Sequence, residues 1–378
     1  MNFEFSEEQE MLRHQARRLL EGRCDSTVVR RVLESTALMD NGLWQAISGL
    51  GWTATALPES FGGFGMGYLE LCVLAEELGR AVAPLPFSSS IYLAAEAFLI
   101  AGSDTQKAAY LPRIADGTGI GTLALAESSG TVRSENITTQ FDGELLHGKK
   151  LPVPDAEVAD FLIVAAREAG DEVSLFVVSA GHGYSCEVLT TIDGSRSHSA
   201  VQFMDAPAER LGASGRGMQI IEQIYDRAAV LYAFEQLGGA QAALDMGLAY
   251  AKERFAFGRA IGSFQAIKHK LADMYCAVEL ARSNCYYAAW ALANSSRELP
   301  VAAATARLSA GRAFSECAKE NIQIHGGMGF TWEFDCHLYY RRSKLLGLTI
   351  GSEYEWKQKL IERLAARELG AGTSSVAA

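Results

Sequence analysis

Apolar residues recur at the three- and four-residue spacing of amphipathic helices over the first part of the chain. The predicted helices cover residues 6–20, 28–35, 68–80, 88–101 and 104–115, together with one that starts after Asp40. Ser6 and Gln9 have the spacing of a capping box, in which each side chain accepts a hydrogen bond from the other residue's backbone. In the helix after Asp40 the apolar period turns Leu43 and Trp44 inward. These features predict a helical N-terminal domain over residues 1–118.

A different pattern begins near Gly119. Turn-forming pairs such as Asp142-Gly143 and Asp193-Gly194 separate short runs of residues that favour β-strands. The runs cover residues 122–126, 134–139, 144–146, 161–165, 174–178 and 200–203. Short strands joined by tight turns are typical of antiparallel sheets, so residues 119–213 are predicted to form a small antiparallel β domain.

The helical period returns at about Gly215 and holds to Leu369, which predicts a C-terminal helical bundle over residues 214–369. The last residues, 370–378, are small and polar, and they are expected to form a disordered tail. The predicted fold is therefore mainly α with a small central β domain. Residues 264–293 and 301–322 have apolar positions on more than one face, so we expect these helices to pack at the centre of a tetramer.

One stretch within the C-terminal region combines groups suited to a nucleotide. Between Tyr250 and Asp273 two helical segments are joined by a glycine-bearing link, and Ser263 is placed to cap the second segment. The stretch contains Arg254, Phe257 and Gln265, which offer a guanidinium for a pyrophosphate, a ring for packing and an amide for a polar edge. The structural alternative is a helical hairpin with a surface arginine and a core phenylalanine.

This stretch resembles the RxxFG…FQ segment of the acyl-CoA dehydrogenase family. A second family motif, QIHGGMGF, stands at residues 323–330. The resemblance extends over about residues 3 to 369. It implies the family's three-domain fold, with an N-terminal helical domain, an antiparallel β domain and a C-terminal four-helix bundle.

The resemblance also implies an activity, the α,β-dehydrogenation of an acyl-CoA thioester by FAD with a glutamate as base and electron-transfer flavoprotein as electron acceptor. In the family each site is shared between two subunits. One subunit holds the isoalloxazine ring and the base, and its dimer partner holds the adenosine diphosphate portion. The residues of this chain at the positions of that second group are Arg254, Phe257, Gln265, Gln323, Gly326 and Gly327. The two glycines have no Cβ, which would let the ribityl-phosphate approach closely.

The family residues that hold the isoalloxazine ring are poorly conserved in this chain. Where the family has a TEP-type strand, this chain has Ala126 in place of the threonine that bonds the flavin ring, although Glu127 remains. Where the family has a WIT-type strand, this chain reads Pro152-Val153-Pro154. Proline has no amide hydrogen, so Pro152 and Pro154 have no backbone N–H to donate to a flavin.

The catalytic glutamate of the family aligns with Ile350, in the sequence Ile350-Gly351-Ser352. Some members carry the base on the first long helix of the C-terminal domain instead, at a position that aligns near Ala228. Asp226 lies about half a turn from that position and Glu235 almost two turns beyond it. The catalytic residue is thus not identified, and Asp226 and Glu235 are candidates whose alternative role is an ordinary solvated or ion-paired carboxylate.

Composition excludes several other classes of function. The chain has 378 residues and a net charge of −11, which argues against a nucleic-acid partner. No metal site is expected, because the seven histidines show no HxxxH or similar spacing. Seven cysteines without a CxxC pair, no membrane-spanning apolar run and no signal-peptide pattern at the N-terminus favour a cytoplasmic protein.

Three hypotheses remain. The first is a self-sufficient homotetrameric acyl-CoA dehydrogenase with a relocated base. The second is one subunit of a heteromeric enzyme whose paralogous partner supplies the flavin-ring contacts and the glutamate. The third is a binding relative without enzymatic activity. The uneven loss of the two groups favours the second hypothesis. The sequence FTWEFDCHLYYRR also resembles actinobacterial members that work as α2β2 pairs on steroid-derived or other bulky acyl-CoA substrates.

Overall fold

The computed structural model describes residues 6–128, 131–170 and 172–374, and these form two compact units. Unit 1 combines Met1–Glu21, Cys72–Val82 and Ala229–Ala378, and unit 2 combines Gly22–Leu71 and Ala83–Ala228. Helices predominate, and nearly all strands belong to one sheet. The predicted fold class, mainly α with a central β domain, is confirmed.

Unit 2 holds most of the shorter helices. They are α2 (Ser26–Leu33), α3 (Asn41–Gly49), the 3-10 turns η1 (Trp52–Ala54) and η2 (Glu59–Phe61), α5 (Glu96–Ala101) and α6 (Asp104–Ala115). α3 begins where the sequence predicts, because the Asp40 carboxylate accepts a hydrogen bond from Leu43 N at 2.8 Å. Leu43 and Trp44 are buried, as their spacing predicts. Local capping is therefore enough to locate this helix.

The segment predicted as one amphipathic helix over residues 88–101 has a different structure. It begins as a π-helix, η3 (Ser88–Ala95), continues as α5, and is buried throughout residues 88–98. Each of its three serine hydroxyls has a partner inside unit 2, and the pairs are Ser88–Arg196, Ser89–Asp155 and Ser90–Gly121. The amphipathic prediction was wrong because these polar residues make internal hydrogen bonds instead of facing solvent.

Eight strands form the sheet of unit 2, in the order β6-β7-β3-β2-β4-β5-β8 with β1 beside β4. Their bounds are β1 (Gly121–Ala124), β2 (Gln140–Phe141), β3 (Leu145–Pro154), β4 (Phe161–Arg167), β5 (Val173–Ser179), β6 (Tyr184–Val188), β7 (His198–Pro207) and β8 (Glu209–Leu211). Most neighbours are antiparallel, as expected, but β1 and β2 run parallel to β4. The strand expected at residues 134–139 is not formed. Its first half is a 3-10 turn, η4 (Ser134–Asn136), residues 137–139 have no regular structure, and β2 begins only at Gln140.

A buried ion pair fixes the segment that follows β1. Lys150 on β3 is fully buried and donates to Glu127 Oε1 at 2.7 Å and to Leu125 O at 3.1 Å. The same carboxylate accepts from Thr138 N at 2.7 Å and from Thr139 N at 2.8 Å. Burial alone would raise the pKa of Glu127, but these hydrogen bonds, led by the one from Lys150, lower it to about 2. The carboxylate therefore joins three separate segments of the sheet domain.

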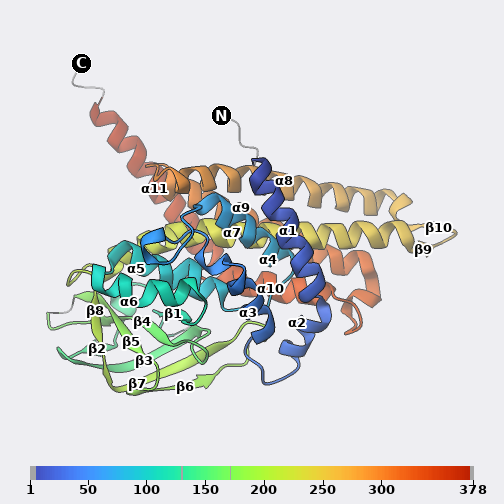
Figure 1. Cartoon of the computed structure of the whole chain (residues 1–378). Helices are drawn as coiled ribbons and strands as arrows, with labels where there is room; N and C mark the ends of the chain where they lie inside the picture. Colours follow the sequence, from blue (N-terminus) through green and yellow to red (C-terminus); the bar gives the residue numbers. More distant parts are fainter. Residues whose placement is uncertain (1–5, 129–130, 171, 375–378) are drawn as a thin grey trace. The chain divides into compact units, whose positions relative to one another are not determined.

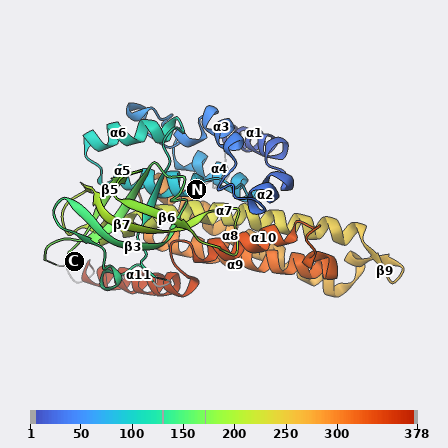
Figure 2. The ribbon, with the colours of Figure 1, turned by 90° about the horizontal axis from the view of Figure 1, so that it is seen from below.

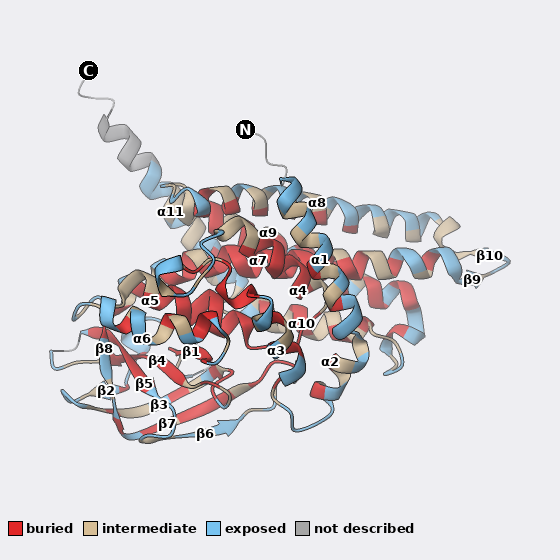
Figure 3. Cartoon of the chain, viewed as in Figure 1, coloured by how far each residue is buried: buried red, intermediate tan, exposed pale blue. Residues whose placement is uncertain are grey.

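Unit 1 is built on three long helices, α7 (Gly217–Glu253) from residue 229 onward, α8 (Gln265–Ala293) and α9 (Leu299–His325). α8 packs along α9, which also contacts α10 (Cys336–Leu348) and α11 (Glu353–Ser374) (Figure 2). Residues 229–240 of α7 are buried on every side (Figure 3). α11 continues past the expected end of the bundle at Leu369, and residues 375–378 of the expected tail lie outside the described residues.

Two further helices, α1 (Glu7–Arg23) and α4 (Tyr68–Arg80), contribute residues 7–21 and 72–80 to unit 1. The predicted capping box of α1 is present, with Ser6 N donating to Gln9 Oε1 at 2.9 Å and Gln9 N donating to Ser6 Oγ at 3.2 Å. α4 has the predicted bounds, because its apolar period is uninterrupted over that range.

α4 and α7 touch through their backbones within unit 1. A Cβ on Gly79 would lie 1.9 Å from Glu235 O, and a Cβ on Gly238 would lie 1.8 Å from Glu76 O. Only glycine permits so close an approach. It leaves two carboxylates of α4 buried, and each is neutralised by arginines of unit 1. The pairs are Glu76 with Arg13 at 3.1 Å and with Arg282 at 2.8 Å, and Glu77 with Arg17 at 2.7 Å.

No helix in the described ranges combines the length and hydropathy that crossing a bilayer requires. Nor do those ranges contain a group of three or more His, Cys, Asp or Glu side chains that could hold a metal ion.

We predict that Glu127→Gln destabilises the sheet domain by about 3–5 kcal/mol, because it leaves the Lys150 ammonium buried without a carboxylate. The pKa of Glu127 is depressed in the folded state, so the pair stabilises the protein fully above pH 4.5 and stops doing so as the pH falls through about 2. Urea unfolding followed by circular dichroism should therefore show a variant-to-wild-type difference that is constant from pH 5 to 7 and shrinks in acid.

The matched control is Glu135→Gln, which removes an exposed carboxylate of the same domain that lies 3.9 Å from Arg133. It should change stability by less than about 0.5 kcal/mol. The double variant Glu127→Gln/Lys150→Met should recover part of the loss, because it removes the buried charge as well. Equal stability of Glu127→Gln and Glu135→Gln would contradict the assignment.

Candidate functional site

The end of the long bundle in unit 1 carries a short β-hairpin (Figure 1). Immediately after α7, β9 (Phe255–Ala256) pairs with β10 (Arg259–Ala260) around the two turn residues Phe257 and Gly258. Both turn residues have positive φ, 54° and 79°, which a type I′ turn requires. Gly258 adopts this conformation freely, whereas a non-glycine residue in it costs on the order of 1–3 kcal/mol.

The ring of Phe257 is 96% exposed, so the strained turn presents it to the outside of the chain. Its only described ring contact is with Phe264, whose ring centroid lies 6.3 Å away. Among the described residues no buried contact of the Phe257 ring offsets the strain. The alternative of a core phenylalanine is therefore excluded, and the turn has the properties expected where a contact outside the chain stabilises it.

Arg254 lies between α7 and this hairpin, and its side chain is exposed. Its backbone carbonyl accepts from Ile261 N at 2.8 Å, which closes the base of the hairpin. The guanidinium makes no ion pair with any residue that the structure describes. A fixed backbone and an unneutralised cation suit the side chain to an anionic ligand from outside the chain.

Gln265 is the first residue of α8 and is exposed. The predicted serine cap of this helix is wrong, because the residue at the N-cap position is Phe264 and it makes no side-chain cap. Ser263 belongs instead to a 3-10 turn, η5 (Ile261–Ser263), and its hydroxyl donates to Ala260 O at 2.7 Å. The amides at the start of α8 are thus not capped by a serine hydroxyl.

The second motif forms the C-terminal end of α9 and the turn η6 (Gly326–Phe330). Gln323, Gly326 and Gly327 are all exposed. Gly326 has φ +60°, and a Cβ added at either glycine would meet no heavy atom within 4 Å. The backbone here is bare on its outer side, as the close approach of a ribityl-phosphate would require.

His325, between the two halves of the motif, is buried and is not placed to act as a base. Its ring stacks on Tyr250 with centroids 3.9 Å apart, and its Nδ1 lies 2.8 Å from Asn321 O. Burial lowers its pKa, which favours the neutral ring. The stacking also links the two motifs, because Tyr250 precedes Arg254 by one turn of α7 and His325 directly precedes Gly326. Both motifs therefore lie at the same end of unit 1.

Of the residues expected at the flavin-ring strands, Ala126 lies two residues after the end of β1, outside regular structure. Ala126 O accepts from Leu151 N at 2.8 Å, and Pro154 O accepts from Thr122 Oγ1 at 2.6 Å. Pro152 and Pro154 both belong to β3. The strand positions that would face a flavin ring thus exist in this domain, but two of them have no N–H to donate.

The three positions considered for the base differ in their surroundings. Ile350 lies in the turn between α10 and α11 with φ +56°, and its carbonyl accepts from Trp356 Nε1 at 3.2 Å. Asp226 is buried on the part of α7 that belongs to unit 2. Glu235 is buried in unit 1, with Oε1 3.7 Å from Nη1 of the fully buried Arg342. This ion pair gives Glu235 a structural role.

Sequence reasoning missed two features of this region. The type I′ hairpin was not predicted, because Phe-Gly is not one of the Asn-Gly or Asp-Gly pairs that signal such turns. The buried arginines, Arg307 and Arg342, were also missed, because arginine in an amphipathic helix ordinarily indicates the solvent face. A Gly at the second turn position was the one local signal for the hairpin.

Two family models match the chain. The acyl-CoA dehydrogenase N-terminal domain matches residues 6–118, and the acyl-CoA dehydrogenase C-terminal domain matches residues 215–363. Among curated relatives, the acyl-CoA dehydrogenase IpdE2 of Mycobacterium tuberculosis is 33% identical over 338 residues, which cover 89% of this chain and 91% of that protein.

Solved structures of acyl-CoA dehydrogenases are similar to this chain as well. The Tcur3481–Tcur3483 steroid ACAD superposes with a TM-score of 0.87 at 32% identity, covering 96% of this chain and 99% of that chain. The ChsE4–ChsE5 complex from Mycobacterium tuberculosis superposes with a TM-score of 0.88 at 27% identity, covering 97% and 99%. With both terminal domains matched and a relative above 30% identity along most of its length, this chain belongs to the acyl-CoA dehydrogenase family.

Proposed function

We propose that this chain is one subunit of a heteromeric, FAD-dependent acyl-CoA dehydrogenase, and that it completes in trans the flavin site of a paralogous partner. The observation that carries the proposal is the asymmetry between the two half-sites. The end of unit 1 keeps an exposed Arg254, a strained and exposed Phe257 and a bare Gly326-Gly327 backbone. The sheet domain, in contrast, has prolines where N–H donors are needed.

Each residue of the retained half-site has a role that its own chemistry supports. The guanidinium of Arg254 would hold the pyrophosphate by charge-assisted hydrogen bonds. The ring of Phe257 packs against the adenosine portion, while Gln265 and Gln323 offer amide donors and acceptors to its polar edges. FAD, when bound, supplies the hydride acceptor for oxidation of the Cα–Cβ bond. This chain's contribution is therefore to bind and orient.

The nature of the relatives supports a heteromeric assembly and a bulky substrate. One similar structure is a two-component complex, and the other is described as a steroid ACAD. We propose a steroid-derived or similarly bulky acyl-CoA as substrate and electron-transfer flavoprotein as electron acceptor. A self-sufficient homotetramer with a base at Asp226 or Glu235 is the second candidate, favoured only by the burial of both carboxylates.

A tetrameric assembly is also proposed. One face of α8 exposes a row of residues at helical spacing that includes apolar side chains, namely Ala272, Cys276, Leu280, Ser283 and Tyr287. Leu280 is 68% exposed in the isolated chain. A helix with a second apolar face requires a partner outside its own bundle.

The first test of the proposal is flavin content. Purified alone, the chain should retain little FAD, because Ala126, Pro152 and Pro154 lack the ring contacts. Addition of a paralogous subunit that carries the TEP and WIT strands and a catalytic glutamate should restore about one flavin per heterodimer. The absorbance of bound flavin at known protein concentration measures this, and a stoichiometrically yellow, active homo-oligomer would refute the heteromeric assignment.

The second test is Arg254→Ala in the reconstituted complex. Loss of the guanidinium–phosphate contact should weaken flavin binding by a factor of roughly 30 to several thousand, because the phosphate is left without its cation. Lys252→Ala is the matched control, since it removes an exposed cation two residues away and should leave flavin binding unchanged. Equal flavin retention by the two variants would show that Arg254 does not bind the cofactor.

The third test concerns the base. Asp226→Asn and Glu235→Gln should leave turnover per bound flavin within about a factor of ten, whereas removal of a general base costs about 10² to 10⁴. Glu235→Gln should instead lower the melting temperature, because it removes the carboxylate charge 3.7 Å from the buried Arg342 guanidinium. The measurement is steady-state dehydrogenation with an artificial electron acceptor. Abolished turnover with flavin still bound would place the base on this chain.

A further inference from the structure

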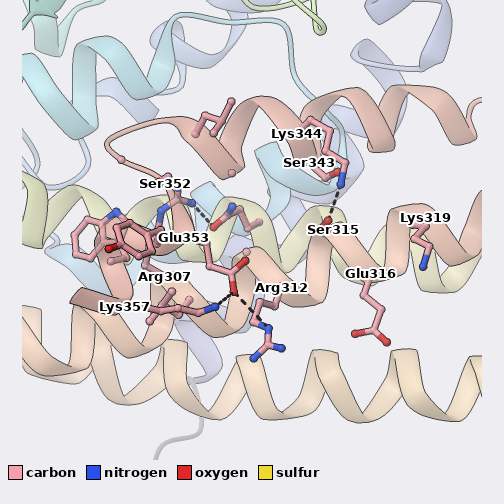
Figure 4. Close-up of a pocket in the computed structure, with 18 of the residues that line it drawn as sticks. Arg307, Arg312, Ser315, Glu316, Lys319, Ser343, Lys344, Ser352, Glu353 and Lys357 are labelled. Atoms are coloured by element: carbon pink, nitrogen blue, oxygen red, sulfur yellow. Dashed lines mark hydrogen bonds and ion pairs between the residues drawn. The ribbon is translucent and has the colours of Figure 1, made fainter. Parts of the chain in front are cut away.

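A pocket of unit 1 between α9, α10 and the start of α11 is lined by Gly351 and Ser352 (Figure 4). These two residues follow Ile350, the position that aligns with the catalytic glutamate of the family. The pocket is therefore part of the candidate site already described. None of the residues from Arg254 to Gln265 lines it, so the link that joins α7 to α8 lies outside the pocket.

Three of the proposed flavin contacts lie at the start, the tip and the end of this link. Arg254 precedes β9, Phe257 stands in the hairpin turn, and Gln265 begins α8. The residues between them determine how the three groups are placed relative to one another. Two of those residues, Arg259 and Phe264, make side-chain contacts that the proposed function does not use.

The ring of Phe264 contacts two side chains of the hairpin. The guanidinium carbon of Arg259 lies 4.0 Å from the ring centroid, within the range of a cation–π contact. The ring of Phe257 meets it at 90° with the centroids 6.3 Å apart, which is an edge-to-face pair. Phe264 therefore connects both the turn and β10 with the start of α8.

The backbone that carries Phe264 is fixed by its own contacts. Its N–H donates to Ile261 O at 3.1 Å, and its carbonyl accepts from two amides in the first turn of α8. Gly262, in the same link, packs on α7 so closely that a Cβ there would lie 2.8 Å from Ala251 O. A ring on such a backbone can hold a neighbouring side chain in place.

The exposed ring of Phe257 depends on Phe264 for its orientation. Phe257 is 96% exposed, and the contact with Phe264 is its only described ring contact. A side chain that rotates freely loses that freedom when it binds a ligand, which lowers the affinity. Because Phe264 directly precedes Gln265, the same ring also links the position of Phe257 to that of the amide.

The hairpin contains a second phenylalanine that lacks these contacts. Arg259 pairs with Ala256 and Phe255 pairs with Ala260, so Arg259 and Phe255 lie on opposite faces of the hairpin. Phe255 is 66% exposed and makes no ring contact with any residue that the structure describes. It therefore offers an internal comparison for Phe264.

We propose that Phe264 is a positioning residue of the flavin half-site and that Arg259 acts through it. The ring of Phe264 holds Phe257 and Gln265 in a fixed relative position, as two contacts to one ligand require. The guanidinium of Arg259 keeps the Phe264 ring in place. This role presupposes the proposed contact in trans with the flavin, but neither residue needs to touch the flavin itself.

The first experiment measures FAD binding by the complex reconstituted with the paralogous subunit, followed by flavin fluorescence. Phe264→Leu should weaken FAD binding by about five- to fiftyfold, because both ring contacts are lost and Phe257 must be ordered on binding. Phe264→Tyr keeps the ring and should stay within about threefold of the wild type. The melting temperature of both variants should be unchanged.

Phe255→Leu is the matched control, since it makes the same change on the same hairpin at a ring without contacts. It should change FAD binding by less than about twofold. Equal effects of Phe264→Leu and Phe255→Leu would overturn the positioning role.

The second experiment uses the free full-length chain without FAD and follows hydrogen exchange of the Ile261 amide, which donates to Arg254 O. Arg259→Met should speed this exchange by about two- to fivefold, because the cation–π contact is lost, and Phe264→Leu by at least as much. Arg259→Lys keeps a cation beside the ring and should lie closer to the wild type.

The two experiments separate this role from the proposed function. Unchanged exchange in both Phe264→Leu and Arg259→Met would show that the ring does not hold the hairpin. Faster exchange with unchanged FAD binding would overturn the role of Phe264 in the half-site if Arg254→Ala still releases the flavin. If Arg254→Ala also retains the flavin, the proposed contact in trans is wrong, and the positioning role is overturned with it.

Discussion

The backbone contact between α4 and α7 is the constraint on which the charge distribution of unit 1 depends. Because Gly79 and Gly238 let the two helices approach to contact distance, the carboxylates of Glu76 and Glu77 cannot reach water. Buried carboxylates must be paired, and the arginines that pair with them come from α1 and α8. Glu235 lies at the same contact and is paired with Arg342 of α10. One steric requirement therefore determines the positions of charged residues on three other helices, α1, α8 and α10.

The sequence predicts those parts of the fold that are set by local interactions. The capping residues Ser6 and Asp40 and the uninterrupted apolar period of residues 68–80 were sufficient to place α1, α3 and α4. Local sequence patterns do not predict burial where a residue distant in the sequence supplies the hydrogen-bond partner. The serines at 88–90 are polar in sequence but buried in the structure, because Arg196 and Asp155, far along the chain, supply their hydrogen bonds.

Some features of the candidate site were predictable from the sequence, and others depend on the three-dimensional structure. Identities at Arg254, Gln323 and the glycine pair could be read from motifs, and the absence of N–H groups at Pro152 and Pro154 follows from chemistry alone. The exposure of Phe257 and the strain in its turn could not be read from motifs, because they depend on the hairpin geometry. A strained turn with an exposed aromatic ring would be expected to relax if nothing used it. Its presence is the physical reason for treating the retained half-site as functional.

The two-residue turn at Phe257 and Gly258 also has a kinetic consequence. A flexible loop would lose conformational entropy when it docks on another molecule, at roughly 0.5–1.5 kcal/mol for each mobile side chain that is immobilised. A tight hairpin has already lost much of that freedom in the unbound chain. Pre-organisation of this kind mainly lengthens the lifetime of a complex. We therefore expect a molecule bound by this hairpin to dissociate slowly.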